Sequence, residues 1–278
     1  MPHLRLTHPD RPTLPFRQTQ SDEDQRQAVA NVTPELGVDR PPLVHIETQE
    51  RQRSIQGRVT APRRARESGE SDWLQALANY ADELESAVDE YQGEGYTLED
   101  DIRNESLNCL LESVTWTLSG GNPYEIQFQA EIPIGLGTMQ AQDTQPRNPT
   151  VNTGMDVAAR VGGVDLPGLR EMQVSRSIGL EKKAIFDADN AENNSLIADE
   201  GDQQVITFRG TLTGTESERR AVENDLKALQ NGDKTTFETR FPGYSLDGFV
   251  TDYTSKIESR MGDSMTHFDL TFIEGIIK

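Results

Sequence analysis

Two stretches of the chain carry a glycine within the alternation of a β-strand: Arg53-Ser54-Ile55-Gln56-Gly57-Arg58-Val59 and Thr207-Phe208-Arg209-Gly210-Thr211-Leu212-Thr213. The prediction of the fold starts from these two strands. An amphipathic helix and then two or more strands are predicted after each. The last strand of each set alternates apolar and polar residues, with Ile126, Phe128 and Ala130 in the first set and Phe268, Leu270 and Phe272 in the second. We therefore predict an internal repeat, in which Gly57 corresponds to Gly210 and Phe128 to Leu270.

The first helix is predicted over Asp72–Tyr91, with Ser71 or Asp72 as its N-cap. Its apolar residues recur every three or four positions, at Leu74, Leu77, Ala81, Leu84 and Val88. A charged loop, Arg63–Glu70, is predicted before it. A hairpin of Leu110–Leu118 and Tyr124–Ile134 is predicted after it. In the second set, Thr215 or Glu216 begins a shorter helix that Gly232 stops.

These elements divide the chain into four predicted segments. Residues 1–42 are polar and rich in proline, so we expect an extended N-terminal arm, with one short strand at His3–Thr7. A first domain is predicted over residues 43–134, a linker over 135–168 and a second domain over 169–278. The fold class that follows is α+β, mainly β.

The formal net charge of -20 disfavours nucleic-acid binding, which normally requires a basic surface. Only six of the 27 basic residues are lysine. Abundant carboxylates with little lysine are typical of proteins that work in concentrated salt, where the repulsion is screened. We therefore hypothesise a halophilic, haloarchaeal source; an ordinary acidic surface is the alternative. No stretch approaches the roughly 20 apolar residues of a membrane-spanning helix, so no membrane span is expected.

No catalytic, cofactor-binding or metal residues are predicted, and the protein is not expected to be an enzyme. The single cysteine, Cys109, lies in an apolar run and is expected to be buried. The best cation candidate is the loop 187–202, which begins Asp187-Ala188-Asp189 but lacks the glycine and glutamate of a calcium loop. The basic cluster Arg63-Arg64-Ala65-Arg66 is expected to contact an acidic neighbouring subunit rather than phosphate.

The second set of elements resembles the tail-tube-like domains of tailed viruses. The resemblance lies in four stretches: Phe208-Arg209-Gly210-Thr211-Leu212, Thr236-Phe237-Glu238, Leu246-Asp247-Gly248-Phe249-Val250 and the closing His267-Phe268-Asp269-Leu270-Thr271-Phe272-Ile273-Glu274. It covers residues 164–278 well and 43–134 loosely. The family includes tube, distal tail (baseplate adaptor) and hub proteins. The resemblance implies two tandem tail-tube-like domains, each a split β-barrel or β-sandwich flanked by one α-helix.

The resemblance also implies a function. The protein would be a structural virion protein of the tail tip, located in the virion tail, that forms a homo-oligomeric ring. The ring would be a hexamer or a pseudo-sixfold trimer, would contact the tail tube protein and other baseplate proteins, and would let DNA pass through its lumen without specific binding. One alternative is a component of a cellular contractile injection system. Another is a carbohydrate- or receptor-binding β-domain, with Trp116, Tyr124 and Tyr244 as stacking residues.

Overall fold

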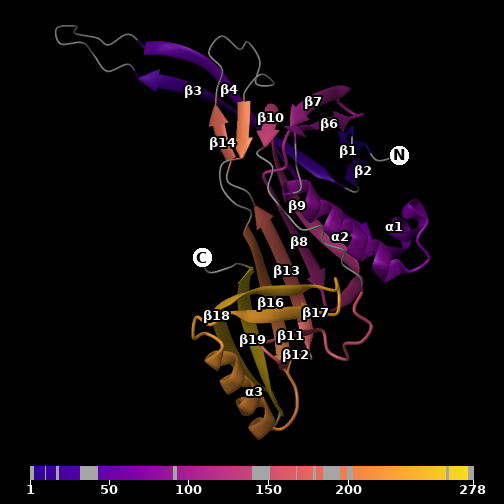
Figure 1. Cartoon of the computed structure of the whole chain (residues 1–278), viewed down its shortest axis with the longest axis vertical. Helices are drawn as coiled ribbons and strands as arrows, with labels where there is room; N and C mark the ends of the chain where they lie inside the picture. Colours follow the sequence, from indigo (N-terminus) through magenta and orange to yellow (C-terminus); the bar gives the residue numbers. More distant parts are fainter. Residues whose placement is uncertain are drawn as a thin grey trace, which may run out of the picture.

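The computed structural model describes residues 3–9, 11–16, 19–31, 43–89, 93–139, 151–166, 168–177, 180–183, 195–198, 203–260 and 263–274. Strands predominate in these ranges, which confirms the prediction of a mainly β fold (Figure 1). The helices are α1 (Ala61–Ser68), α2 (Trp73–Asp89) and α3 (Glu216–Ala228). In Figure 1, α1 and α2 lie together beside one part of the molecule, and α3 lies at the opposite end.

The largest sheet contains 11 described strands, and every pairing in it is antiparallel. In order from one edge, the strands are β12 (Val164–Leu166), β11 (Ala159–Val161), β17 (Thr235–Thr239), β18 (Ser245–Arg260), β19 (Asp263–Glu274), β16 (Gln203–Leu212), β13 (Leu169–Ser177), β8 (Ser113–Ser119), β9 (Asn122–Pro133), β4 (Leu43–Thr60) and β3 (Gln20–Asn31). We call it the main sheet. It is an open sheet with β12 and β3 at its edges.

Two further sheets have four described strands each. The first, which we call the N-terminal sheet, is ordered β2 (Arg11–Phe16), β1 (Leu4–His8), β6 (Tyr96–Asp100) and β7 (Glu105–Cys109). The second is ordered β14 (Leu180–Lys183), β15 (Ser195–Ala198), β10 (Leu136–Met139) and β5 (Gly93–Glu94). Its β10–β15 pair is parallel.

Both glycine strands pair with the closing strand of their own set. Gly57 of β4 lies opposite Phe128 of β9, and Gly210 of β16 lies opposite Phe268 of β19. A Cβ on Gly210 would lie 2.5 Å from Cζ of Phe268, so the glycine leaves room for the ring. The register therefore matches Phe128 with Phe268. Our alignment with Leu270 was wrong by two positions, because an alternating pattern cannot distinguish registers that differ by two.

Strands from both predicted domains lie in one sheet, which also contains β3 of the predicted arm and β11 and β12 of the segment predicted as a linker, 135–168. Strand β13, from the predicted second domain, pairs with β16 on one side and with β8 of the first domain on the other. The β8–β13 ladder runs from Ser113↔Ser177 to Ser119↔Glu171. We call this ladder the seam. The strands on its two sides are the first half and the second half, and each half includes the helices and turns that connect its strands, α1 and α2 in the first and α3 in the second.

Helix α2 confirms the helix predicted from the apolar periodicity. The Asp72 carboxylate accepts hydrogen bonds from the backbone N–H of Leu74 (2.9 Å) and Gln75 (3.2 Å), as an N-cap does. The helix packs against β8, β9 and β13. Residues Leu77, Ala81, Leu84 and Val88 of its predicted stripe are fully buried. Cys109 is also buried, as predicted.

The charged loop predicted at Arg63–Glu70 was wrong, because most of this segment is helix α1. Pro62 occupies the first turn, where its missing N–H costs nothing, and Gly69 ends the helix with a φ of 73°. Ala61 and Ala65, one turn apart, form the buried face. That face has only these two small residues, so the surrounding charges concealed the helical pattern.

The extended arm predicted for residues 1–42 was also wrong where the structure describes it. Strand β1 matches the predicted His3–Thr7, but it forms a hairpin with β2. The buried residues of this hairpin are Leu4, Leu6, Leu14 and Phe16. Pro12 and Pro15 are tolerated because β2 is the edge strand of the N-terminal sheet. Residues 32–42 lie outside the described ranges.

The N-terminus of α3 offers a direct test of helix capping. Thr215 and Glu218 form a capping box, in which each side chain bonds the other residue's backbone N–H. We expect Thr215→Ala to lower the free energy of unfolding by about 1 kcal/mol, measured by urea denaturation. Ser217→Ala, at an exposed neighbouring position, is the control. Equal urea midpoints for the two variants would contradict the capping role.

Candidate functional site

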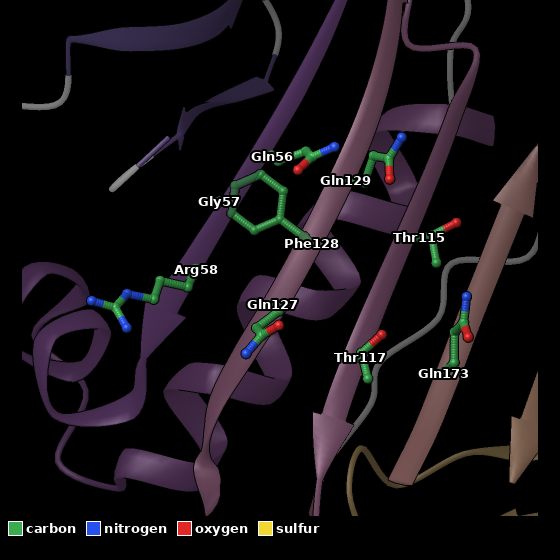
Figure 2. Close-up of a pocket in the computed structure, with 9 residues that line it drawn as sticks. All are labelled: Gln56, Gly57, Arg58, Thr115, Thr117, Gln127, Phe128, Gln129 and Gln173. Atoms are coloured by element: carbon green, nitrogen blue, oxygen red, sulfur yellow. The ribbon is translucent and has the colours of Figure 1, made fainter. Parts of the chain in front are cut away.

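Uncharged polar side chains gather on one face of the main sheet. They line a groove of about 520 Å³ that crosses four strands (Figure 2). Its lining residues are Gln56, Gly57 and Arg58 of β4, Thr115 and Thr117 of β8, Gln127, Phe128 and Gln129 of β9, and Gln173 of β13. The groove therefore includes residues from both sides of the seam.

Strand alternation explains why these side chains share a face. In β9, Ile126, Phe128 and Ala130 are buried, so Gln127 and Gln129 between them point to the other side. In β8, Val114, Trp116 and Leu118 are buried in the same way. Because α2 packs against β8 and β9, the apolar side chains take the helix-covered face and the polar ones take the opposite face.

The register aligns these residues in two rows across the strands. One row runs Gln127, Thr117, Gln173 and Thr207, and the other runs Gln56, Gln129, Thr115 and Ser175. We call these eight residues the polar strip. Across the seam, the Thr115 hydroxyl donates to Oγ of Ser175 at 3.1 Å. Although 27% of the chain is charged, none of the eight is.

Charged residues lie at the margins of the polar strip. Glu131 accepts hydrogen bonds from Gln129 (2.9 Å) and Ser54 (2.8 Å) at one margin. At another, the Arg209 guanidinium lies 2.5 Å from Glu171 and 3.7 Å from Asp269. Arg58 extends the row of Gln127 at the β4 end. The strip itself is a neutral surface in a strongly acidic protein.

The chemistry of the polar strip is limited to hydrogen bonding. Amides and hydroxyls both donate and accept, so they hold water or contact a polar polymer. Such groups do not carry charge at neutral pH, so they neither attract phosphate by ion pairing nor act as a general base. The strip can therefore contact solvent or a partner through hydrogen bonds.

The described ranges contain no group of three or more His, Cys, Asp or Glu side chains that could hold a metal ion. His267 of β19 is half-buried, and its Nδ1 lies 3.0 Å from the Thr211 hydroxyl. The start of the cation-candidate loop, Asp187–Asn194, lies outside the described ranges.

Two of the three predicted stacking residues cannot reach a ligand. Trp116 is 0% exposed and Tyr244 is 4% exposed, and both donate hydrogen bonds to the buried Glu85 carboxylate. The prediction was wrong for them because Trp116 lies on the apolar face of β8 and Tyr244 is buried in the turn before β18. Tyr124 is half-exposed at the start of β9.

The basic cluster at Arg63, Arg64 and Arg66 lies on α1. Nε of Arg63 is 3.3 Å from Glu67, and Arg64 contacts Glu83 at 2.5 Å and stacks over the Tyr80 ring at 5.2 Å. Burial raises the pKa of Glu83, while the Arg64 guanidinium acts in the opposite direction. Two of the three arginines thus have partners within the chain, and contact with a neighbouring subunit stays a prediction.

The polar strip was not predicted as a site. Its signal in the sequence was the alternation of Thr115, Thr117, Gln127 and Gln129 with apolar residues. That alternation shows which side chains face away from a core, but the alignment with Gln173 and Thr207 requires the strand order.

A scan against protein-family models finds no family that matches this chain, and a search of curated proteins finds no match either. Among the described residues, no helix is both long and apolar enough to cross a bilayer.

Proposed function

We propose that this protein is a structural component of the tail tip of a tailed virus of a halophilic archaeon. In this proposal it is a distal tail (baseplate adaptor) or hub protein located in the virion tail. Its two halves correspond to two tail-tube-like units. Copies of the chain form a ring, either a hexamer or a pseudo-sixfold trimer, that continues the tail tube and contacts the tail tube protein and other baseplate proteins.

The observation that carries the proposal is the neutral polar strip on an open sheet. Double-stranded DNA carries one negative charge per roughly 1.7 Å of its axis, and basic residues bind it by releasing counterions. A channel that conducts DNA has to avoid such binding. Amide and hydroxyl groups release no counterions and keep a layer of water between protein and DNA. We propose that the strip faces the channel.

The open edges of the main sheet support the ring. Strand β3 at one edge has 12 residues, and β12 at the other has three. An edge strand carries backbone donors and acceptors that can pair with another chain. Pairing of β12 with part of β3 in a neighbouring copy would satisfy some of these groups, and it would close a ring when repeated by rotation.

Electron microscopy and native mass spectrometry of the purified chain in concentrated salt test the ring. We expect closed rings with the polar strip toward the central opening. A stable monomer across all salt concentrations would count against the proposal. Rings with the strip on their outer surface would reject the channel assignment alone.

Lysine substitution tests the role of the neutral strip. We expect a triple variant with lysine at Gln127, Gln129 and Gln173 to bind double-stranded DNA. Each new phosphate contact should steepen the slope of log affinity against log salt by about 0.9, so three contacts add roughly 2.7. A control variant carries lysine at three exposed positions of α3, Ser217, Ala221 and Asn224.

Virions assembled with each lysine variant test which of the two surfaces contacts DNA. Loss of infectivity is expected for the strip variant and not for the α3 variant, because only the strip contacts the DNA in transit. Equal infectivity of the two variants would mean that DNA does not pass over the strip.

A further inference from the structure

A buried carboxylate connects the two halves of the main sheet. The Glu85 side chain of α2 is 1% exposed. It accepts hydrogen bonds from Nε1 of Trp116 on β8 (2.7 Å), from Nε2 of Gln204 on β16 (3.2 Å) and from the Tyr244 hydroxyl. The Arg176 guanidinium on β13 lies 3.9 Å away. One carboxylate thus contacts four separate segments of the sheet and its turns.

The partners of Glu85 present hydrogen-bond donors to its carboxylate. The tryptophan N–H and the guanidinium can only donate, and the amide nitrogen of Gln204 also donates. The charge of Arg176, which is itself 2% exposed, compensates the buried carboxylate.

The partners lie on both sides of the seam. Glu85 and Trp116 belong to the first half, whereas Arg176, Gln204 and Tyr244 belong to the second. The seam by itself is a single antiparallel ladder, and neighbouring strands of a sheet can twist relative to each other over a wide range of angles. Contacts from a helix above the seam to the turn before β18 restrict that twist.

We propose that Glu85 is a positioning residue that holds the two halves of the main sheet at one angle. Because the polar strip crosses the seam on the opposite face, the same angle sets the curvature of the strip. In the ring, a fixed curvature selects one number of subunits; this last step rests on the proposed function.

Distance measurements between two spin labels in Glu85→Gln test this role. Glutamine keeps the shape of the side chain but removes the charge and places N–H groups among donors. Labels at Ser71→Cys, before α2, and Asn224→Cys, on α3, report on the two halves, since both positions are exposed. The native Cys109 is fully buried and burial raises the pKa of its thiol, so it should not react with the label.

We expect one narrow distance distribution in the wild-type background and the loss of that narrow peak in Glu85→Gln. Glu83→Gln is the matched control, because Glu83 lies on the same helix and pairs with Arg64 within the first half. A narrow peak retained in Glu85→Gln would overturn the proposal. If Glu85→Gln does not fold, Tyr244→Phe decides, since it removes one hydrogen bond and keeps the ring: a broadened peak supports the role and an unchanged peak rejects it.

The distance measurement tests Glu85 whether or not the chain forms a ring. The distances are measured in whatever assembly the wild type forms, after dilution of labelled chains with unlabelled ones. If the wild type forms no ring, the proposed function is overturned, and the distance distributions alone decide whether Glu85 is a positioning residue. Homogeneous rings with a narrow peak in Glu85→Gln overturn the positioning role and leave the proposed function standing.

Discussion

Replacement of Phe208 with alanine is expected to lower the free energy of unfolding by about 3–5 kcal/mol. Phe208 is 1% exposed in the core of the second half. Its ring stacks on Phe268 at a centroid distance of 5.9 Å and meets Phe237 edge-on at 6.5 Å. Alanine would remove both aromatic contacts and leave a cavity in the centre of the second half.

The location of the tryptophans makes this variant a test of coupling. Trp73 lies on α2 and Trp116 lies on β8 beside the seam, so their fluorescence reports on the first half and on the seam. Because the halves share a sheet, we expect the tryptophan signal of Phe208→Ala to shift to lower denaturant together with the circular dichroism signal. Phe208→Leu, which keeps most of the volume, should shift both signals less. An unchanged tryptophan transition would show that the halves unfold independently.

Replacement of Arg53 with methionine is expected to cost about 3–5 kcal/mol, because it removes one member of a buried ion-pair cluster. The Arg53 side chain, on β4, is 0% exposed. It donates to Asp100 of β6 at 2.9 Å and to Glu105 of β7. These bonds attach the N-terminal sheet to the main sheet. Without the guanidinium, the Asp100 carboxylate would lose a cation in a place that water reaches poorly, whereas the more exposed Glu105 would keep Arg51 at 3.0 Å.

Arg103→Met is the matched control for Arg53→Met. Arg103 faces the same Asp100 carboxylate at 3.9 Å, but its side chain is 40% exposed. Exposed ion pairs contribute about 0–1 kcal/mol, so the control should unfold close to the wild type. Urea denaturation of both variants at neutral pH measures the difference. Similar losses in the two variants would contradict the claim that burial makes Arg53 important.

The same cluster predicts a pH dependence. Burial acts to raise the pKa of Asp100, but the backbone N–H groups of Arg103 and Ile102 and the Arg53 guanidinium outweigh it, so the pKa lies below its ordinary value. A carboxylate with a lowered folded-state pKa stabilises the fold above its unfolded pKa of about 3.9 and loses that contribution as pH falls through the folded value. We expect the stability difference between wild type and Asp100→Asn to shrink in this acidic range. A difference that is constant with pH would contradict this.

Local periodicity was sufficient to predict helix α2, the β8–β9 hairpin and the two closing strands, because each depends on residues a few positions apart. Helix α1 was missed because its buried face is two alanines. The β1–β2 hairpin was missed because prolines and charges weaken a strand pattern, and its burial depends on β6, more than 80 residues later in the chain.

The candidate site was predictable only in part. The outward residues of β8 and β9 are visible in the sequence, yet the polar strip exists because β13 pairs with β8, and no local pattern specifies that pairing. A glutamate on the buried side of α2, next to Leu84, was a signal for a buried network. Its partners could not be named from the sequence, because Tyr244 lies 159 residues away.

That separation has a consequence for the nascent chain. At roughly 5–20 residues per second, about 8–30 s pass between synthesis of Glu85 and of Tyr244. During this interval, the Glu85 carboxylate on α2 lacks its partner Tyr244. Until β13 has been synthesised, the edge of β8 that pairs with it is also exposed. Non-local pairings of this kind also slow folding after release from the ribosome. We therefore expect the chain to fold as a whole, after most of it has been synthesised. Aggregation is expected to be most frequent while the first half lacks its partner strands.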